Sequence, residues 1–404
     1  MSGRVLIVGA GPAGASLAHL LAHRGIDVTL LERQSDFERE FRGEVIVPSG
    51  AAALEQIGVW DRLADIPTCR PQYVEMFFDR KSVLKVDFDP TVFDRHPPMA
   101  VSQPALLEML VAEAGRSPSF HFERGASVKD LLRRDGRVTG VRARTAAGEI
   151  ELEADLVVGG DGRASVVRRK ASLPAHAKAP PMDVVWCKLP CPEGFDGARF
   201  HIGHAHLVIG YKTWDGQLQV AWAILKGTYG ALRDRGVERW VEEMADWVAP
   251  DWSEHFRAHA HAPGQPFLLD TVSDRVDRWS IPGALVIGDA AHTMSPVGGQ
   301  GINVALRDSI AAANHLVPVL AAAEPDPAAI DAACRALEVE RVREIAAIQR
   351  LQAVPPRILF NRAWWAEPLR GAIAASLQLG AVRALALPRV RAFLNETSKV
   401  ELRV

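Results

Sequence analysis

Apolar residues in the first part of this chain are grouped into short runs separated by a helical pattern. Residues 5–8 form a β-branched run typical of a buried parallel strand, and residues 15–23 follow with helical spacing. Residues 28–31 form a second such run, which ends at Glu32. This order of strand, helix and strand predicts a βαβ unit built on a parallel sheet.

Later segments carry three further patterns. Residues 49–63 and 104–114 have helical spacing, and residues 142–144 and 150–152 form an expected strand pair around a glycine turn. Residues 83–88 and 217–224 alternate between apolar and polar side chains, which is typical of antiparallel strands covered on one face. The chain beyond residue 328 is expected to be helical to residue 352 and, after two prolines, again to about residue 393.

These patterns divide the chain into three regions of an α/β protein. Residues 1–70, 100–181 and 280–325 are expected to form a discontinuous, Rossmann-like nucleotide-binding domain. Residues 71–99 and 182–279 are expected to form an inserted, mainly antiparallel β-sheet domain that binds the substrate. Residues 326–404 are expected to form a helical C-terminal region.

The first strand is followed by glycines in the spacing GxGxxG. Gly9 permits the tight turn, Gly11 lets the backbone approach a pyrophosphate, and Gly14 lets the helix pack closely on the strand. The phosphates would meet the free N–H groups at the start of the helix, where Pro12 and Ala13 lie. The context of strand, turn and helix makes this a predicted dinucleotide site.

The end of the second strand predicts which nucleotide binds. Glu32 lies 18 residues beyond Gly14, where a carboxylate accepts hydrogen bonds from ribose hydroxyls. An acid at this position repels a 2′-phosphate, so an unphosphorylated adenosine, as in FAD or NAD, is expected. The adjacent Arg33 is a further candidate contact.

A second glycine-rich stretch lies almost three hundred residues downstream and favours FAD. Residues 284–287 form another buried-strand run, and Asp289 follows it at the sheet edge where ligands bind, placed to contact ribityl hydroxyls. Four residues then precede a helix that begins near Ile302: Pro296, Gly298, Gly299 and Gly301. Their backbone N–H groups and the helix dipole would stabilise the negative charge of reduced flavin.

On these motifs the chain resembles the FAD-dependent aromatic hydroxylase family, the single-component flavoprotein monooxygenases related to para-hydroxybenzoate hydroxylase. The similarity covers roughly residues 1–320. Its downstream positions are Gly288-Asp289-Ala-Ala-His292, Pro296, Gly298-Gly299-Gln300-Gly301, Asn303 and Asp308. A third motif of the family is Gly160-Asp161-Gly162-Arg163-Ala-Ser165-Val-Val-Arg168.

The resemblance implies further site residues. Arg42 matches an arginine that the family places near the flavin, and Gln103 falls where relatives carry an arginine or a glutamine that contacts FAD. Arg42, Asp161 and Arg168 would aid the transient binding of NADH or NADPH. The residues expected beside the reacting ring are Arg42, Pro296, Gly298 and Gly299. The remaining expected FAD contacts at the downstream loop are Asp289, Gly301, Ile302 and Asn303.

The implied activity is that of an FAD-dependent monooxygenase that uses NAD(P)H and O2. Reduced flavin reacts with O2 at C4a, and the hydroperoxide gives its distal oxygen to an electron-rich ring that is held close in the absence of water. His204, Tyr211 and Trp222 are candidates for the pocket of an aromatic or polycyclic substrate. The base that deprotonates a phenol is left open among His201, His204, His206 and Tyr211.

Three alternative functions remain open. A halogenase shares the FAD motifs, but residues 219–225 lack the proline of its tryptophan-rich signature. A flavin-dependent reductase of a prenyl or lipid-like substrate would suit the amphipathic residues 366–388, which could also pack on the protein itself. A flavin-binding protein without turnover is the non-enzymatic alternative.

Composition agrees with an enzyme of small molecules. The 404 residues carry a formal net charge of −2 without a basic cluster, so we expect no nucleic-acid partner. Four cysteines without a CxxC pair suit a reducing cytoplasm, and no stretch of about 20 apolar residues suggests a membrane span. The histidines near residue 204 lack acidic or thiol partners at ligand spacing, so no metal is expected. The protein is expected to be a monomer or a homodimer.

Overall fold

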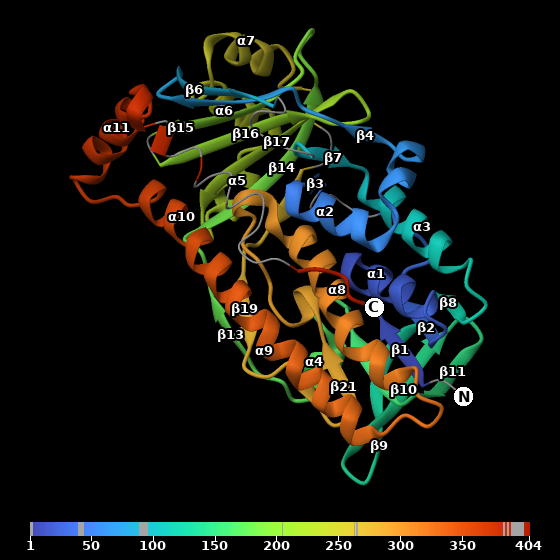
Figure 1. The fold of residues 1–404 in the computed structure, drawn as a ribbon. Helices are drawn as coiled ribbons and strands as arrows, with labels where there is room; N and C mark the ends of the chain where they lie inside the picture. The colour runs from blue at the N-terminus through green and yellow to red at the C-terminus, as the bar shows by residue number, and fades with distance from the viewer. Residues whose placement is uncertain are drawn as a thin grey trace.

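Two large sheets, one mainly parallel and one mainly antiparallel, frame the molecule in a computed structural model (Figure 1). The structure describes residues 3–38, 44–88, 96–203, 205–261, 263, 266–382, 384–385, 388 and 400–404. Arg42 and His204 lie outside these residues, as does most of the segment after residue 388.

The first sheet has six strands, of which all but the edge strand β20 run parallel. In spatial order they are β20 (Ser280–Ile281), β21 (Ala284–Val286), β12 (Leu156–Gly159), β1 (Arg4–Val8), β2 (Asp27–Glu32) and β8 (Phe120–Arg124). The central strands are apolar and buried on both faces, as parallel strands covered by other layers require. This confirms the Rossmann-like βαβ expectation for the start of the chain.

Helices and a small sheet cover the parallel strands. The helices that pack together beside it are α1 (Pro12–Ala22), α2 (Pro48–Ile57), α3 (Gln103–Ala114) and α8 (Gln300–Leu320). A three-stranded sheet contacts β1, β2 and β12, and it consists of β9 (Ser127–Arg134), β10 (Arg137–Thr145) and β11 (Gly148–Glu153). Together these elements bury the largest apolar core.

The helix expected over residues 49–63 is shorter than predicted. It ends at Gly58, whose φ of 86° is the left-handed conformation that closes many helices. A separate 3-10 helix, Trp60–Asp65, follows. The difference arises because the apolar spacing of the sequence continues through the turn, whereas the α-helical backbone conformation ends there.

The second sheet has seven strands, and most of its pairs are antiparallel, as the alternating pattern predicted. In spatial order they are β18 (Phe267–Leu269), β14 (Met182–Pro190), β17 (Gln217–Leu225), β16 (His206–Lys212), β15 (Ala198–Gly203), β5 (Tyr73–Phe78) and β6 (Lys81–Asp87). One pair, β5 with β15, is parallel because the two strands come from distant segments. We call the face that carries Ala221 and Ala223 the inner face.

Three helices that the alternating pattern did not predict cover the opposite, outer face. They are α5 (Tyr229–Arg233), α6 (Val237–Ala245) and α7 (Pro250–Ala258). Trp252 and Phe256 of α7 are fully buried against this face together with Val208 of β16. The outer face is therefore closed by the protein's own side chains.

Short strands link the two large sheets. Three of them pair as one sheet: β3 (Val45–Ile46), β7 (Met99–Val101) and β4 (Thr68–Cys69). A further pair is β13 (Ala175–Lys178) with β19 (Ser273–Val276), and the helix α4 (Val166–Lys170) follows β12. The domain division expected from the sequence remains a prediction.

The late helices agree with the expected pattern up to residue 376. They are α9 (Pro327–Gln352), α10 (Val354–Leu359) and α11 (Ala366–Ser376). The Asp326 side chain caps α9 by accepting hydrogen bonds from the N–H groups of Ala328 and Ala329. The last five residues are not helical: the Leu402 N–H donates to Gln56 of α2 at 2.7 Å. Among the residues that the structure describes, no helix has both the length and the apolar composition needed to cross a membrane.

Candidate cofactor and substrate site

The three glycine motifs meet at one edge of the parallel sheet. β1, β12 and β21 are neighbours, with Val8 paired to Gly159 and Gly159 paired to Val286. The loops that leave these strands therefore lie side by side, at the carboxyl edge where α/β sheets bind ligands. Segments separated by almost three hundred residues are thus joined in one site, as the sequence analysis expected.

Two glycines of the first motif are required by the protein's own backbone. Gly9 has φ of 96°, and a Cβ atom there would lie 2.7 Å from the Asp161 Cα atom. A Cβ atom on Gly14 would lie 2.0 Å from the Gly9 carbonyl oxygen. The loops after β1 and β12 and the helix α1 consequently approach one another at backbone distance.

Gly11 is different, because the protein's packing does not require it. Its φ is −71°, and the nearest atom to an added Cβ would be the Gly160 carbonyl oxygen at 3.8 Å. No side chain caps the N-terminus of α1 at this residue. Open space in front of uncapped N–H groups fits a pyrophosphate, so the residues present are compatible with FAD.

The expected ribose contact is buried at the end of β2. The Glu32 carboxylate accepts hydrogen bonds from the N–H groups of Ala10 and Gln34, each at 3.0 Å. These bonds fix the carboxylate beside the first glycine turn. Arg33 is exposed next to it, and Gln103 is the half-buried first residue of α3.

The third motif mainly stabilises its own loop. The Asp161 carboxylate caps α4, accepting from the Ser165 hydroxyl at 2.5 Å and from the Val166 N–H at 2.6 Å. Burial raises the pKa of Asp161. Arg168 forms an ion pair with Asp274 at 3.2 Å. Roles of Asp161 and Arg168 toward a nicotinamide remain predictions.

The downstream loop presents Asp289 and a glycine turn. Asp289 lies directly after β21, in the 3-10 turn Gly288–Ala290, and its carboxylate is 3.4 Å from the Arg163 guanidinium. Pro296 precedes the turn Val297–Gly299, where Gly298 and Gly299 have φ of 74° and 61°. Only glycine adopts these conformations readily at two successive positions. The turn leads into α8.

Glycine at the second position of α8 has no explanation within the protein. Gly301 has no positive φ, and an added Cβ would meet no atom within 4 Å. Ile302 is buried next to it. As at Gly11, the absence of a side chain leaves space in front of helix N–H groups.

Asn303, expected to contact FAD, uses its whole side chain within the protein. Its amide nitrogen donates to the carbonyls of Val45 at 3.1 Å and Gly299 at 2.7 Å, and its oxygen accepts from the Val47 N–H at 3.1 Å. The side chain is fully buried. Asn303 therefore holds the glycine turn against β3.

A buried charge network supports the downstream loop from below. Asp308 of α8 accepts from the Gly288 N–H at 3.1 Å and from His292 Nε2 at 2.6 Å, and it pairs with Arg341 of α9 at 2.8 Å. Arg341 and Arg307 both contact Glu344. Burial alone would raise the pKa of Asp308, but His292 and Arg341 lower it to about 2.

The sequence analysis missed Arg341 and Glu344. Their spacing of three residues in a predicted helix is also that of an ordinary exposed pair, and both are in fact buried. Only the packing of α9 on α8 distinguishes the two cases.

Strand register arranges the inner face in rows. Tyr211 of β16 pairs with Gln219 of β17, which pairs with Lys188 of β14. The next row along β16, β17 and β14 consists of Ile209, Ala221 and Trp186. The row after it consists of Leu207, Ala223 and Val184. Val297 of the glycine turn and Leu359 and Phe360 at the end of α10 pack over these rows.

The candidate substrate residues do not share one surface. Tyr211 lies on the inner face, whereas Trp222 faces outward, where its indole nitrogen donates to His206 Nδ1 at 3.4 Å. His201 is enclosed in the core beside Trp252, and burial lowers its pKa to about 3. Among the described candidates for a base, Tyr211 alone has its side chain on the inner face.

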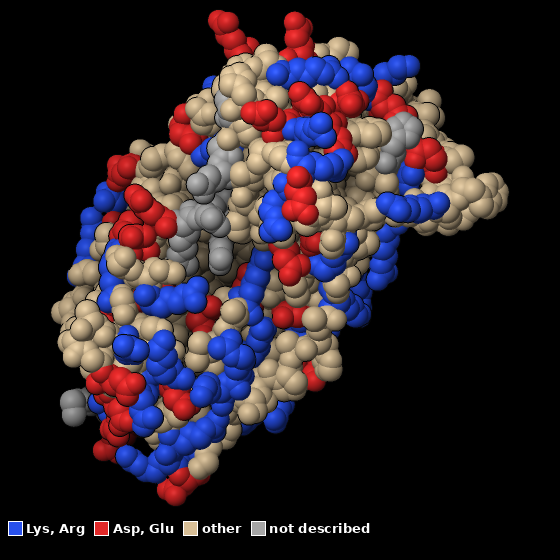
Figure 2. All heavy atoms as spheres, turned by 180° about the vertical axis from the view of Figure 1, so that it is seen from behind, with Lys and Arg blue, Asp and Glu red and all other residues tan. Residues whose placement is uncertain are grey.

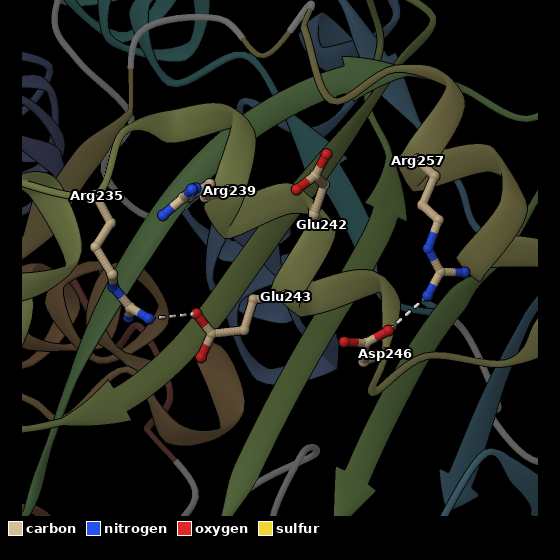
Figure 3. Close-up of a pocket in the computed structure, with 6 residues that line it drawn as sticks. All are labelled: Arg235, Arg239, Glu242, Glu243, Asp246 and Arg257. Carbon is tan, nitrogen blue, oxygen red and sulfur yellow. Dashed lines mark hydrogen bonds and ion pairs between the residues drawn. The ribbon is translucent and has the colours of Figure 1, made fainter.

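Of two surface hollows, one lies away from the inner face, and the other is lined in part by His206 and Trp222. One, of about 430 Å³, is lined wholly by charged side chains of α6, α7 and the preceding loop, and it includes the ion pairs Arg235–Glu243 and Arg257–Asp246 (Figure 3). A hollow of about 620 Å³ lies between α5 and the segment before α11 and reaches the end of the inner face at Ala205 and Leu225. The charged hollow does not suit a flat apolar ligand.

The back of the molecule carries many basic side chains over its lower half (Figure 2). Several belong to β10 and α4 and are paired with carboxylates, as in Arg142–Glu151 at 2.9 Å and Lys170–Asp130 at 3.3 Å. Because neighbouring acids neutralise these charges, we assign no ligand to this surface. Within the described ranges, no three His, Cys, Asp or Glu residues are grouped as a metal site requires.

Comparisons with known proteins show what this chain is similar to. The family model described as "FAD binding domain" matches residues 3–335. A 6-methylpretetramide 4-monooxygenase of Streptomyces rimosus is 32% identical over 349 residues, which cover 85% of this chain and 83% of that protein. A kynurenine 3-monooxygenase of Salinispora arenicola is 29% identical over 366 residues, covering 82% and 75%. The crystal structure of p-nitrophenol 4-monooxygenase PnpA from Pseudomonas putida has the same fold, with a TM-score of 0.80 at 19% identity over 99% of both chains.

Replacing Asp308 by Asn should destabilise the fold at neutral pH. The substitution leaves the buried Arg341 charge without its carboxylate, at an expected cost of about 3–5 kcal/mol. The stabilisation from this carboxylate is present above its unfolded pKa of about 4 and is lost as the pH falls toward about 2. Urea unfolding should therefore show a difference in the free energy of unfolding between wild type and variant, and this difference should become smaller as the pH is lowered below about 4.

The exposed Asp61→Asn variant is the control and should match the wild type throughout. An Asp308→Asn protein as stable as the wild type at pH 7 would contradict the network.

Proposed function

Since this chain belongs to the FAD binding domain family and is an FAD-dependent monooxygenase, we propose that it hydroxylates a flat aromatic molecule held on the inner face of the seven-stranded sheet. The observation that carries the proposal is an apolar face with small residues, Ala221 and Ala223, against which Val297 of the glycine turn packs. The names of the similar 6-methylpretetramide and kynurenine monooxygenases support a small aromatic substrate.

In this proposal the cofactor spans the edge of the parallel sheet. The N-terminus of α1 at Gly11 binds the pyrophosphate, Glu32 the adenosine ribose, and Asp289 the ribityl chain. The N–H groups from Gly298 to Ile302 face the ring end that carries negative charge when reduced. Bound FAD, once reduced by NADH or NADPH, supplies the activation of O2.

The protein's own residues position the substrate and exclude water. Leu359 and Phe360 pack on the inner face, and Val297 of the glycine turn packs on it as well. Apolar side chains around the substrate would keep its ring close to the cofactor and exclude water from the reaction. We further propose that Pro296 shields the reacting edge.

The polar side chains around the cofactor remain part of the proposal. Gln103 and Arg33 are offered as additional FAD contacts, and Arg168 and Asp161 as the surface that meets NADH or NADPH. A cytoplasmic location and a monomeric or homodimeric state are also proposed.

The glycine motif provides a matched pair of variants. Gly14→Ala should destabilise the FAD-free protein by about 1–3 kcal/mol or more, because the new methyl group overlaps the Gly9 carbonyl. Gly11→Ala should unfold at the wild-type temperature without FAD, because the protein leaves room for the methyl group there. Its FAD affinity should fall at least about tenfold, or about 1.4 kcal/mol.

Thermal unfolding and fluorescence titration with FAD measure both effects. The exposed Gly230→Ala variant in α5 has neither clash nor expected ligand and serves as the control. Full FAD affinity in Gly11→Ala would contradict the assigned phosphate site.

Turnover distinguishes the proposed activity from its alternatives. Flavin-loaded protein mixed with NADH or NADPH should consume O2 faster when a suitable phenol is added, and the product should be heavier by one oxygen atom. Oxygen electrode traces and mass spectrometry provide the readout. Product formed without O2 would favour the reductase, and product that requires halide would favour the halogenase.

Filling the inner face should block the reaction without removing FAD. Ala223→Leu places a larger side chain at the centre of the face, so product formation should fall at least about tenfold while the flavin stays bound. Ala231→Leu enlarges a side chain in the 620 Å³ hollow and is the matched control. Loss of product in Ala231→Leu alone would place the substrate in the hollow instead.

A further inference from the structure

One end of the inner face is polar, in contrast to the apolar rows beside it. Tyr211 and Gln219 are directly opposite each other on β16 and β17. Glu44, which immediately precedes β3, lies within electrostatic range of the Tyr211 hydroxyl and of Lys188. The three side chains of Glu44, Tyr211 and Gln219 are 7%, 6% and 2% exposed.

Each of these side chains has a buried polar atom whose bonding capacity the protein leaves unused. Glu44 Oε2, the Tyr211 hydroxyl and Gln219 Oε1 have no hydrogen-bond partner among the described residues. A buried polar group left in this way costs about 1–3 kcal/mol. Three such groups lie at one end of an apolar face, and they fit a ligand that supplies the missing bonds.

Two neighbouring groups, the Gln219 amide nitrogen and Lys188, already have partners within the protein. Gln219 Nε2 donates one of its two N–H groups to the Cys187 carbonyl at 3.1 Å, and the amide oxygen is left without a donor among the described residues. Lys188 is bound to Asp215 at 2.6 Å. An unused amide oxygen requires a donor, so the ligand that completes this end must carry an O–H or N–H group.

We propose that Glu44, Tyr211 and Gln219 bind the hydroxyl-bearing edge of a phenolic substrate. This inference rests on the proposed function and adds the residues that bind and orient the substrate's hydroxyl group. A hydroxyl donates to Gln219 or Glu44, and its oxygen accepts from Tyr211. Fixing the hydroxyl fixes the ring, because the remaining carbons then lie on the rows that contain Ala221 and Ala223.

The protonation states agree with this arrangement. Burial raises the pKa of Glu44 to about 8, with Lys188 opposing and Asp215 adding to the shift. Burial, and then Glu44, raises the pKa of the Tyr211 hydroxyl. Near pH 7 both groups are neutral and hold a proton that they can share with a ligand oxygen.

The test uses flavin-loaded protein and two probes that differ by one hydroxyl, 2-naphthol and naphthalene. Binding of each is followed through the visible spectrum of the flavin. Wild-type protein should bind 2-naphthol at least about tenfold more tightly. Glu44→Leu and Tyr211→Phe should lose this preference while binding naphthalene as before, and Glu44→Gln, which keeps the hydrogen bonds, should retain it.

A pH series separates this role from a merely structural one. Between pH of about 6.5 and about 8.5 a phenol stays neutral while Glu44 ionises. An ionised carboxylate is the stronger acceptor, so the preference for 2-naphthol should increase with pH in the wild type and stay constant in Glu44→Gln. The exposed Glu238→Leu variant on α6 should follow the wild type.

Equal preference in Glu44→Leu and wild type would overturn the inference, as would a wild type without preference. Failure of the proposed function is distinguished by turnover: oxygenation that persists, and is lost in Ala223→Leu, leaves that function standing even if Glu44 proves irrelevant. A protein that binds neither probe would overturn both the assignment of the inner face and the inference.

Discussion

The site depends on a contact between backbones at the carboxyl edge of the parallel sheet. Gly9 and Gly14 let the loops after β1 and β12 and the helix α1 approach without an intervening side chain. This close approach directs the N–H groups of α1 to one side of the edge. The strand β21, next to β12, then brings Asp289 to the same place. A methyl group at either glycine would separate segments whose proximity creates the site.

The second half of the site is maintained by buried charge rather than by backbone contact. Asp308 accepts a hydrogen bond from the Gly288 N–H and pairs with Arg341 of α9. The position of the downstream loop therefore depends on α9. Burying these charges is costly unless each is paired. His292 provides a further partner for Asp308, and Arg307 pairs with Glu344. Asn303 likewise joins the glycine turn to β3, because its buried amide donates to the carbonyls of Gly299 and Val45. The loop is thereby held in one position before any ligand binds.

Local sequence patterns predicted the nucleotide-binding half of the molecule. They could not predict how strands from distant segments pair with one another. Strands such as Arg4–Val8 and the glycine spacing are signals within a few residues. Whether Tyr211 and Trp222 share a face depends instead on the register of two different strands, and a shift by one residue reverses the answer. Glu44 stands two residues from the expected Arg42 in the sequence, yet it is buried and within electrostatic range of Lys188 and Tyr211, which no local pattern reveals.

An apolar face with one polar end selects both the ligand and its orientation. If a phenol were reversed, its hydroxyl would lie against Leu207 and Ala223, and the groups at Tyr211 and Gln219 would stay unsatisfied. Each unmade bond costs about 1–3 kcal/mol, and every 1.4 kcal/mol is about tenfold in population. Two or three such bonds therefore favour one orientation by factors of about tens or more. Asn303 ties the glycine turn to Val45, the residue after Glu44, so the hydrogen bonds that orient the ring are made on the side of the site next to that turn.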